Sequence, residues 1–229
     1  FLPDLYSRVY NAQGSLSGPM PVLPQMFSFF ASGRYLNDNG FIYGTRTFNP
    51  SDSSNFSAND PQDWYVGSTG DGSDVPMNYS RRLTLQGKLQ AKVGSGKGIV
   101  VQGLYQENTY REYDHRFRLN PDGDYERHQT SFLVSGSYTH VFGESSFLDA
   151  TASLYVSDYK QYVYKNPYDP RYVNPERQQD AGANSFLTGG TENWHFKHTT
   201  TTATGRLDYT AQITSIHQVK IGVEAQRHT

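Results

Sequence analysis

Residues 81–93 alternate between apolar and polar side chains more regularly than any other part of the chain. From Leu83 onward every odd position is apolar or glycine, and every even position is polar. A period of two predicts a β-strand with one apolar face, here made by Leu83, Leu85, Leu89, Ala91 and Val93. Strands of soluble proteins usually run for about 5 to 6 residues, whereas a tilted membrane-spanning strand needs roughly 9 to 11. The segment therefore fits either a membrane strand or an outer strand of a large soluble β-domain.

Six further segments have the length and the alternation of β-strands. They cover approximately residues 25–36, 98–113, 130–142, 146–164, 193–212 and 218–227. No segment of helical length shows a 3.6-residue period, and glycine is frequent, at 21 residues. The sequence therefore predicts an all-β, antiparallel up-and-down fold of about seven strands.

The connections between the predicted strands alternate between short and long. Residues 94–97, 143–145 and 213–217 have the length of tight turns, and the other three connections run for about forty, about fifteen and more than twenty-five residues. Long connections are uncommon in compact domains unless they carry function. Long strands with short turns at one end and long loops at the other are typical of bacterial outer-membrane barrels. We therefore expect a partial transmembrane β-barrel with long extracellular loops.

The overall composition excludes several classes of function. The formal charge of −2 provides no basic surface, so nucleic acid is not an expected partner. The chain contains no cysteine, which rules out disulfides, thiolate metal sites and a cysteine nucleophile within it. There is no run of 18 apolar residues, so the sequence predicts no membrane-spanning helix.

In a barrel, the two faces of each strand would meet different solvents. The apolar face would meet lipid, and the polar face a wet lumen lined by Arg34, Lys88, Arg206, Asp208 and Glu224. Tyrosines are enriched at membrane interfaces, where a ring can lie in the apolar layer and its hydroxyl in water. The expected members of such an aromatic girdle are Tyr35, Tyr105, Tyr138, Tyr155 and Tyr209.

Three kinds of motif suggest phosphate or metal binding, but turns and strand geometry explain them better. The glycine-rich segment 94–98 lacks both the spacing and the following helix of a phosphate loop, so it reads as a hairpin turn. His195 and His198 are three residues apart, which on a strand directs them to opposite faces. The Asp- and Gly-rich segments 70–74 and 120–124 do not fit the calcium loop that ends in Glu, and turn chemistry explains them. The sequence predicts no catalytic residues, no metal site and no cofactor, and hence a protein that is not an enzyme.

Aromatic residues in and beside the long connections are the candidate ligand-binding residues. Exposed aromatic rings can stack on a ligand, or can hold loops against each other. The two readings are equally open for this set, which consists of Trp64, Tyr65, Tyr162, Tyr164, Tyr168, Tyr172 and Trp194.

Several segments resemble TonB-dependent outer-membrane receptors of the kind common in Bacteroidetes-like bacteria. Residues 27–35 (FSFFASGRY), followed by 43–46 (YGTR) and 48–50 (FNP), look like the first barrel strand of such receptors. The resemblance continues through 75–78 (VPMN), 162–173 (YVYKNPYDPRYV) and 218–224 (QVKIGVE), and it covers most of the chain from about Gly18.

The resemblance implies a fold, a location and partners. Such receptors import a ligand through a barrel that holds a plug, using energy from the inner membrane. The chain would be the first part of that barrel, with residues 1–24 as the linker from the plug and 25–229 as the partial barrel domain. Its expected partners are outer-membrane lipid, the remaining barrel and plug or other envelope subunits, and an unknown small ligand.

The sequence departs from the receptor pattern in three respects. It shows no plug before Gly18, no recognisable TonB box and only about seven strands. An odd, small number of strands does not close a bacterial single-chain barrel. Two alternatives therefore remain open: a structural subunit of a cell-envelope assembly, and a soluble β-sandwich module whose loop aromatics stack on sugars.

Overall fold

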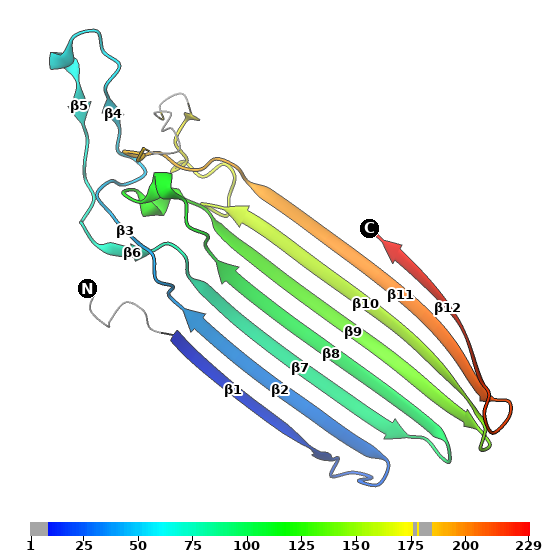
Figure 1. Ribbon diagram of the computed structural model, residues 1–229. Helices are drawn as coiled ribbons and strands as arrows, with labels where there is room; N and C mark the ends of the chain where they lie inside the picture. Colours follow the sequence, from blue (N-terminus) through cyan, green and yellow to red (C-terminus); the bar gives the residue numbers. More distant parts are fainter. Residues whose placement is uncertain (1–8, 176–177, 179–184) are drawn as a thin grey trace.

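The fold is one open antiparallel β-sheet with long loops at one end (Figure 1). The computed structural model describes residues 9–175, 178 and 185–229. Eight long strands follow one another across the sheet in chain order, and β1 and β12 are not paired with each other. This confirms the predicted all-β, up-and-down class and the form of a partial barrel. The strands are β1 Val9–Pro19, β2 Phe27–Asp38, β7 Ser80–Lys92, β8 Lys97–Tyr110, β9 Glu126–Phe142, β10 Ser146–Tyr162, β11 Phe196–Gln212 and β12 Gln218–His228.

Strand β1 corrects the predicted number of strands from seven to eight. It lies within residues 1–24, which the sequence analysis interpreted as a linker, and all of it pairs with β2, from Val9 opposite Asp38 to Pro19 opposite Ser28. Its apolar face carries small residues and glycines, including Ala12, Gly14 and Gly18. Because these residues contribute little hydrophobicity, the alternation along β1 does not stand out in the sequence.

Strand boundaries near the long loops also differ from the predicted ones. Strand β9 begins at Glu126 rather than near residue 130, and β11 begins at Phe196 rather than near residue 193. Strands β8 and β10 end at Tyr110 and Tyr162, two or three residues earlier than predicted. At the start of β9, residues 126–129 are polar on both faces, so the period of two disappears from the sequence although the backbone pairing with β10 continues.

The two ends of the sheet are unequal, as the sequence predicts. Short turns join β1 to β2, β7 to β8, β9 to β10 and β11 to β12 at one end, and the long connections lie at the other (Figure 1). The turn at residues 94–96 holds Gly94 and Gly96 at φ +118° and +72°, and the next turn holds Gly143 at φ +64°. Glycine adopts these conformations without strain, which confirms that the glycine-rich segment is a hairpin turn.

The long connections contain short elements of their own. In residues 39–79, β3 Tyr43–Thr45 pairs with β6 Asp74–Pro76, and β4 Ser54–Asn55 pairs with β5 Tyr65–Val66. The described parts of these connections also contain the 3₁₀ helices η1 Pro61–Asp63, η2 His115–Phe117 and η3 Pro121–Gly123. Among the described residues, no helix is long and apolar enough to cross a membrane.

The pairing register gives the long sheet two chemically different faces. Residues directly opposite each other on neighbouring strands share a face. One row across seven strands reads Phe29, Leu89, Val101, Gly136, Ala152, Gly205 and Ala225. The adjacent row on the other face reads Phe30, Lys88, Gln102, Ser135, Ser153, Thr204 and Gln226. We call these the apolar face and the polar face.

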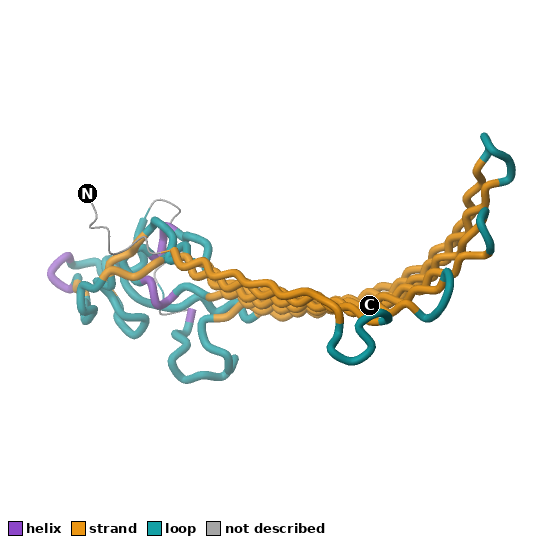
Figure 2. Tube along the Cα trace, turned by 90° about the horizontal axis from the view of Figure 1, so that it is seen from below, coloured by secondary structure: helices purple, strands orange, loops and turns teal. Residues whose placement is uncertain are grey.

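The apolar face is open over its whole extent. Seen from its edge, the sheet is a single curved layer, and no second sheet or helix of the described residues lies along either side of its long strands (Figure 2). Leu89, Ile221 and Val223 are 54%, 68% and 65% exposed. Each aliphatic side chain left in water forfeits about 1.5 to 3 kcal/mol of hydrophobic stabilisation. A continuous apolar surface of this kind requires a non-aqueous neighbour.

Four of the five predicted girdle tyrosines lie on the apolar face. Tyr35, Tyr105, Tyr138 and Tyr209 occupy it by register, but Tyr155 lies opposite Leu133 and Thr202 on the polar face. The Tyr155 hydroxyl donates a hydrogen bond to Ser131 Oγ at 3.3 Å. The prediction for Tyr155 was wrong because its strand positions Leu154 and Val156, not Tyr155, toward the apolar face.

Candidate functional site

The three long connections fold against one another, and we call their described residues in 39–79, 111–125 and 163–195 the loop cap. The buried hydrophobic residues of the described chain all lie here. Met77, Phe117 and Leu187 form the core, with Tyr113 packed against it. Each of these three residues comes from a different connection, so their burial holds together loops that are far apart in the sequence.

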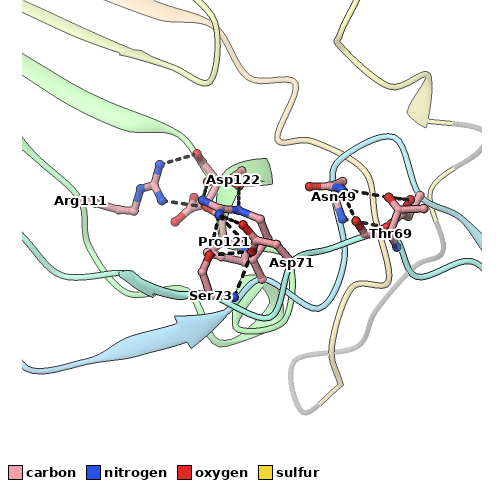
Figure 3. Close-up of polar contacts among 10 residues, drawn as sticks. Asn49, Thr69, Asp71, Ser73, Arg111, Pro121 and Asp122 are labelled. Carbon is pink, nitrogen blue, oxygen red and sulfur yellow. Dashed lines mark hydrogen bonds and ion pairs between the residues drawn. The ribbon is translucent and has the colours of Figure 1, made fainter. Parts of the chain in front are cut away.

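Arg46 and Arg116 link the loops electrostatically. Arg46 donates to Asp122 and, through Nη1, to Asp71 at 3.1 Å and to Ser73 Oγ at 2.6 Å (Figure 3). Arg116 Nη2 lies 2.8 Å from Glu192 Oε1. The Ser73 hydroxyl and backbone N–H, together with Arg46, lower the pKa of the Asp71 carboxyl to about 2. These contacts are charge-assisted, so they fix the loops more firmly than neutral hydrogen bonds would.

Asp52 and Asn49 fix a turn within the first connection. Asn49 Nδ2 donates to the carbonyl and the hydroxyl oxygens of Thr69 at 3.0 and 2.9 Å (Figure 3). The Asp52 carboxylate accepts from the backbone N–H groups of Asn49 and Thr69, each at 2.8 Å. Residues 49–53 therefore form a rigid wall rather than a free loop.

An open cleft of about 700 Å³ lies between this wall and the third connection. Pro50, Ser51 and Ser53 line one side, and Tyr164, Arg171 and Tyr172 line the other. The Tyr172 hydroxyl donates to the Tyr164 carbonyl at 2.9 Å, and the two rings meet edge to face. The Arg171 guanidinium lies 4.0 Å from the centre of the Tyr164 ring. A cleft of this size can hold a small molecule against aromatic and cationic groups.

A second cleft, of about 360 Å³, shares residues 172–174 with the first. Tyr172, Asn193 and His195 are among the residues that line it. His195 also stacks on Tyr162, with ring centres 5.2 Å apart, and Tyr162 stacks on His128 at 4.8 Å. The segment around Tyr172 is therefore the wall common to both clefts.

The structure divides the seven predicted aromatic residues among separate places. Tyr164 and Tyr172 meet at the clefts, and Tyr162 lies beneath them in the stack with His195. Trp64 and Tyr65 lie together in the first connection and line neither cleft, although the Tyr65 hydroxyl lies 3.4 Å from Ser53 Oγ at the edge of the first cleft. Tyr168 and Trp194 are 89% and 67% exposed and line neither cleft. A single binding surface for all seven does not form, and their role in ligand binding stays a prediction.

The five predicted lumen residues share the polar face. Register places Arg34 and Lys88 on the same side as Arg206, Asp208 and Glu224. Arg206 Nε lies 2.6 Å from Asp208 and Arg206 Nη1 lies 3.9 Å from Glu224. Arg34 Nε donates to Asn11 Oδ1 at 3.0 Å. Ion pairs therefore join β11 to β12 on the polar face, whereas hydroxyls and amides dominate its middle.

The Asp-rich turns are occupied by protein contacts. Asp71 and Asp122 bind Arg46, and Asp124 Oδ1 accepts from the Tyr125 backbone N–H at 2.8 Å. Burial raises the pKa of the Asp124 carboxyl to about 7, although the positive charge of Arg111 opposes this shift. In the part of the chain that the structure describes, no three His, Cys, Asp or Glu residues come together as a metal site.

Several residues of the cap and the clefts were missed by sequence reasoning. Arg171 shows one local signal, because it is two residues from Asp169 and pairs with it at 2.9 Å. Arg46 and Asp122 are 76 positions apart, and Asp52 and Thr69 are 17 apart. No pattern in one sequence indicates such pairs. Comparison of the sequence with protein-family models and with curated proteins finds no match.

Proposed function

We propose that this chain forms part of the wall of an outer-membrane TonB-dependent transporter, which binds and imports a small ligand without catalysing a reaction. The observation that supports the proposal is the continuous apolar face of the sheet, which no other described element covers. In this arrangement the apolar face meets lipid, the polar face meets a wet interior and the loop cap lies outside the membrane.

The height of the apolar face supports a membrane location. On β9 it extends from Phe132 to Phe142. A rise of about 3.4 Å per residue and a tilt of about 40° give a height of roughly 25 Å, which matches the apolar band of membrane barrels. Tyr138 and Tyr209 lie toward the turn end and Tyr35 toward the loop end, whereas Tyr105 lies opposite Leu85 near the middle of the strands. The positions of Tyr138, Tyr209 and Tyr35 suit two aromatic girdles.

The open edges of the sheet define the partners of the wall. In the described sheet, β1 and β12 each have a neighbouring strand on one side only. An unpaired backbone group in hydrocarbon costs several kcal/mol, so a membrane sheet has to be closed. We propose that further strands, from the same protein or from another envelope subunit, complete the wall around the polar face.

Ligand capture is assigned to the loop cap. The two clefts at Tyr172 combine aromatic rings with Arg171, Asn174 and His195, and they lie among the long connections at the loop end of the sheet. The rigid core and the ion pairs beneath them keep these side chains in place before a ligand arrives, which reduces the entropy lost on binding.

Membrane extraction tests the proposal. After cell lysis, the full-length protein is expected to stay in the membrane fraction through carbonate and urea washes and to enter solution only with detergent. An exposed apolar face of this extent explains the expected behaviour. A folded β-sheet protein that is monomeric in buffer without detergent contradicts the proposal and favours the soluble module.

A further inference from the structure

The first long connection carries a projecting hairpin, which we call the arm and define as residues 53–67. It extends away from the rest of the loop cap (Figure 1). Its two short strands pair Ser54 with Val66 and Asn55 with Tyr65, and the Gly67 N–H donates to the Ser53 carbonyl at 2.9 Å. The wall formed by Asp52 and Thr69 anchors its base. The arm is therefore an ordered hairpin, and the hydrogen bonds at its base fix the direction in which it leaves the loop cap.

The arm presents apolar side chains to solvent in an ordered arrangement, with Tyr65 and Val66 in its paired strands and Phe56 and Trp64 beyond them. Phe56, Trp64, Tyr65 and Val66 are 45% to 53% exposed. The rings of Phe56 and Trp64 meet edge to face, with centres 6.2 Å apart, and Trp64 Nε1 donates to the Ala58 carbonyl at 3.0 Å. These contacts fix the indole ring without burying it. Rigid, exposed aromatic residues of this kind are the usual anchors of protein interfaces.

The negative charge of the arm favours a partner with a basic surface. Asp60 and Asp63 flank the aromatic tip, and residues 53–67 contain no lysine, arginine or histidine. Asp60 accepts a hydrogen bond from the Gln62 N–H at 2.9 Å, so it also shapes the turn at η1. A negative surface of this kind repels acidic partners and attracts basic ones.

The shape of the arm favours a polypeptide over a small ligand. Small-molecule sites are concave and bury most of the ligand. The arm projects outward, and its residues beyond Ser53 line neither of the two clefts at Tyr172. A projecting tip suits insertion into a depression on a larger surface.

From these observations we propose that the arm is a docking element for a polypeptide partner whose lysine or arginine residues form a rim around apolar side chains. Trp64 is the central anchor, Phe56 supports its ring, and Asp60 and Asp63 pair with the basic rim. This docking does not depend on whether lipid or water covers the apolar face of the long sheet.

Fluorescence of the arm tip provides the test. The chain has two tryptophans, so Trp194→Phe leaves Trp64 as its single indole reporter. The full-length protein carrying this change is placed in nanodiscs of phosphatidylcholine, which has no net charge. The probe is a short synthetic peptide of alternating lysine and leucine. We expect a saturable blue shift of the Trp64 emission, because docking removes the indole from water.

Controls separate docking from non-specific attraction. Replacing Asp60 and Asp63 by asparagine keeps the hydrogen-bonding oxygen at residue 60, and should weaken binding about tenfold or more. Phe41→Ala removes an exposed aromatic residue outside the arm, which is 77% exposed, and should leave the affinity unchanged. The same peptide with glutamate in place of lysine should not bind.

Three outcomes overturn the proposal: no blue shift with the lysine peptide, an equal shift with the glutamate peptide, or equal binding by the asparagine variant. A shift produced by maltoheptaose but not by the lysine peptide would make the arm a sugar-binding element instead.

Discussion

Replacing Leu85 by arginine should destabilise the membrane-embedded protein by about 2 to 4 kcal/mol. Leu85 is on the apolar face near the middle of β7, and it lies opposite Gly33 and Tyr105. Its side chain is 44% exposed in the sheet, so in a bilayer the arginine would have to enter hydrocarbon. Urea titration of the full-length protein in lipid vesicles measures the loss.

The adjacent residue provides the matched control. Gln86→Arg adds the same side chain one position along β7, but on the polar face, opposite Ser32 and Leu104. We expect a change in unfolding free energy of less than about 1 kcal/mol, because water reaches that face. Similar losses for both variants would show that the two faces do not differ in solvent.

Replacing Phe117 by alanine should destabilise the loop cap by about 3 to 5 kcal/mol. Phe117 is 1% exposed and packs with Met77 and Leu187, which come from the other two connections. Its removal leaves a cavity at the point where the three loops meet. Hydrogen exchange of the loop amides measures the effect, and we expect the amides of β7 to β10 to keep their protection, because local openings differ across a structure.

Phe41→Ala is the matched control for the cap, since Phe41 belongs to the same connection as Met77 but is 77% exposed. It should change the unfolding free energy of the cap by no more than about 0.5 kcal/mol. If Phe117→Ala leaves loop exchange unchanged, the buried cluster does not hold the loops together. If it also removes protection from the long strands, the cap and the sheet unfold as one unit.

The sheet is largely predictable from the sequence because apolar and polar residues alternate along most of its strands. Leu83, Leu85 and Leu89 locate β7, and the same pattern locates six further strands. It fails for β1, where small residues carry the apolar face, and at the start of β9, where both faces are polar. Tyr155 shows that residue type alone does not predict which face of the sheet a side chain occupies. The alternation along β10 places Leu154 and Val156 on the apolar face, and Tyr155 therefore lies on the polar face.

The loop cap is much less predictable, because non-local contacts build it. The sequence marks Tyr164 and Tyr172 as aromatic, but their cleft exists only because residues 50–53 lie against them. That wall depends on Asp52 and Thr69, and the cap core joins Met77, Phe117 and Leu187. Turn residues predict where loops occur, and they do not indicate which loops pack together.

Thiol accessibility along β7 tests most directly whether lipid covers one face of the sheet. The chain has no cysteine, so each substitution introduces one thiol into it. Single cysteines are placed at successive positions from Leu83 to Gln90 in the full-length protein, and intact membranes are treated with a small, charged methanethiosulfonate. We predict reaction at Thr84, Gln86, Lys88 and Gln90, and protection at Leu83, Leu85 and Leu89. Equal reaction on both faces, or protection of the even positions alone, would contradict the membrane-wall account.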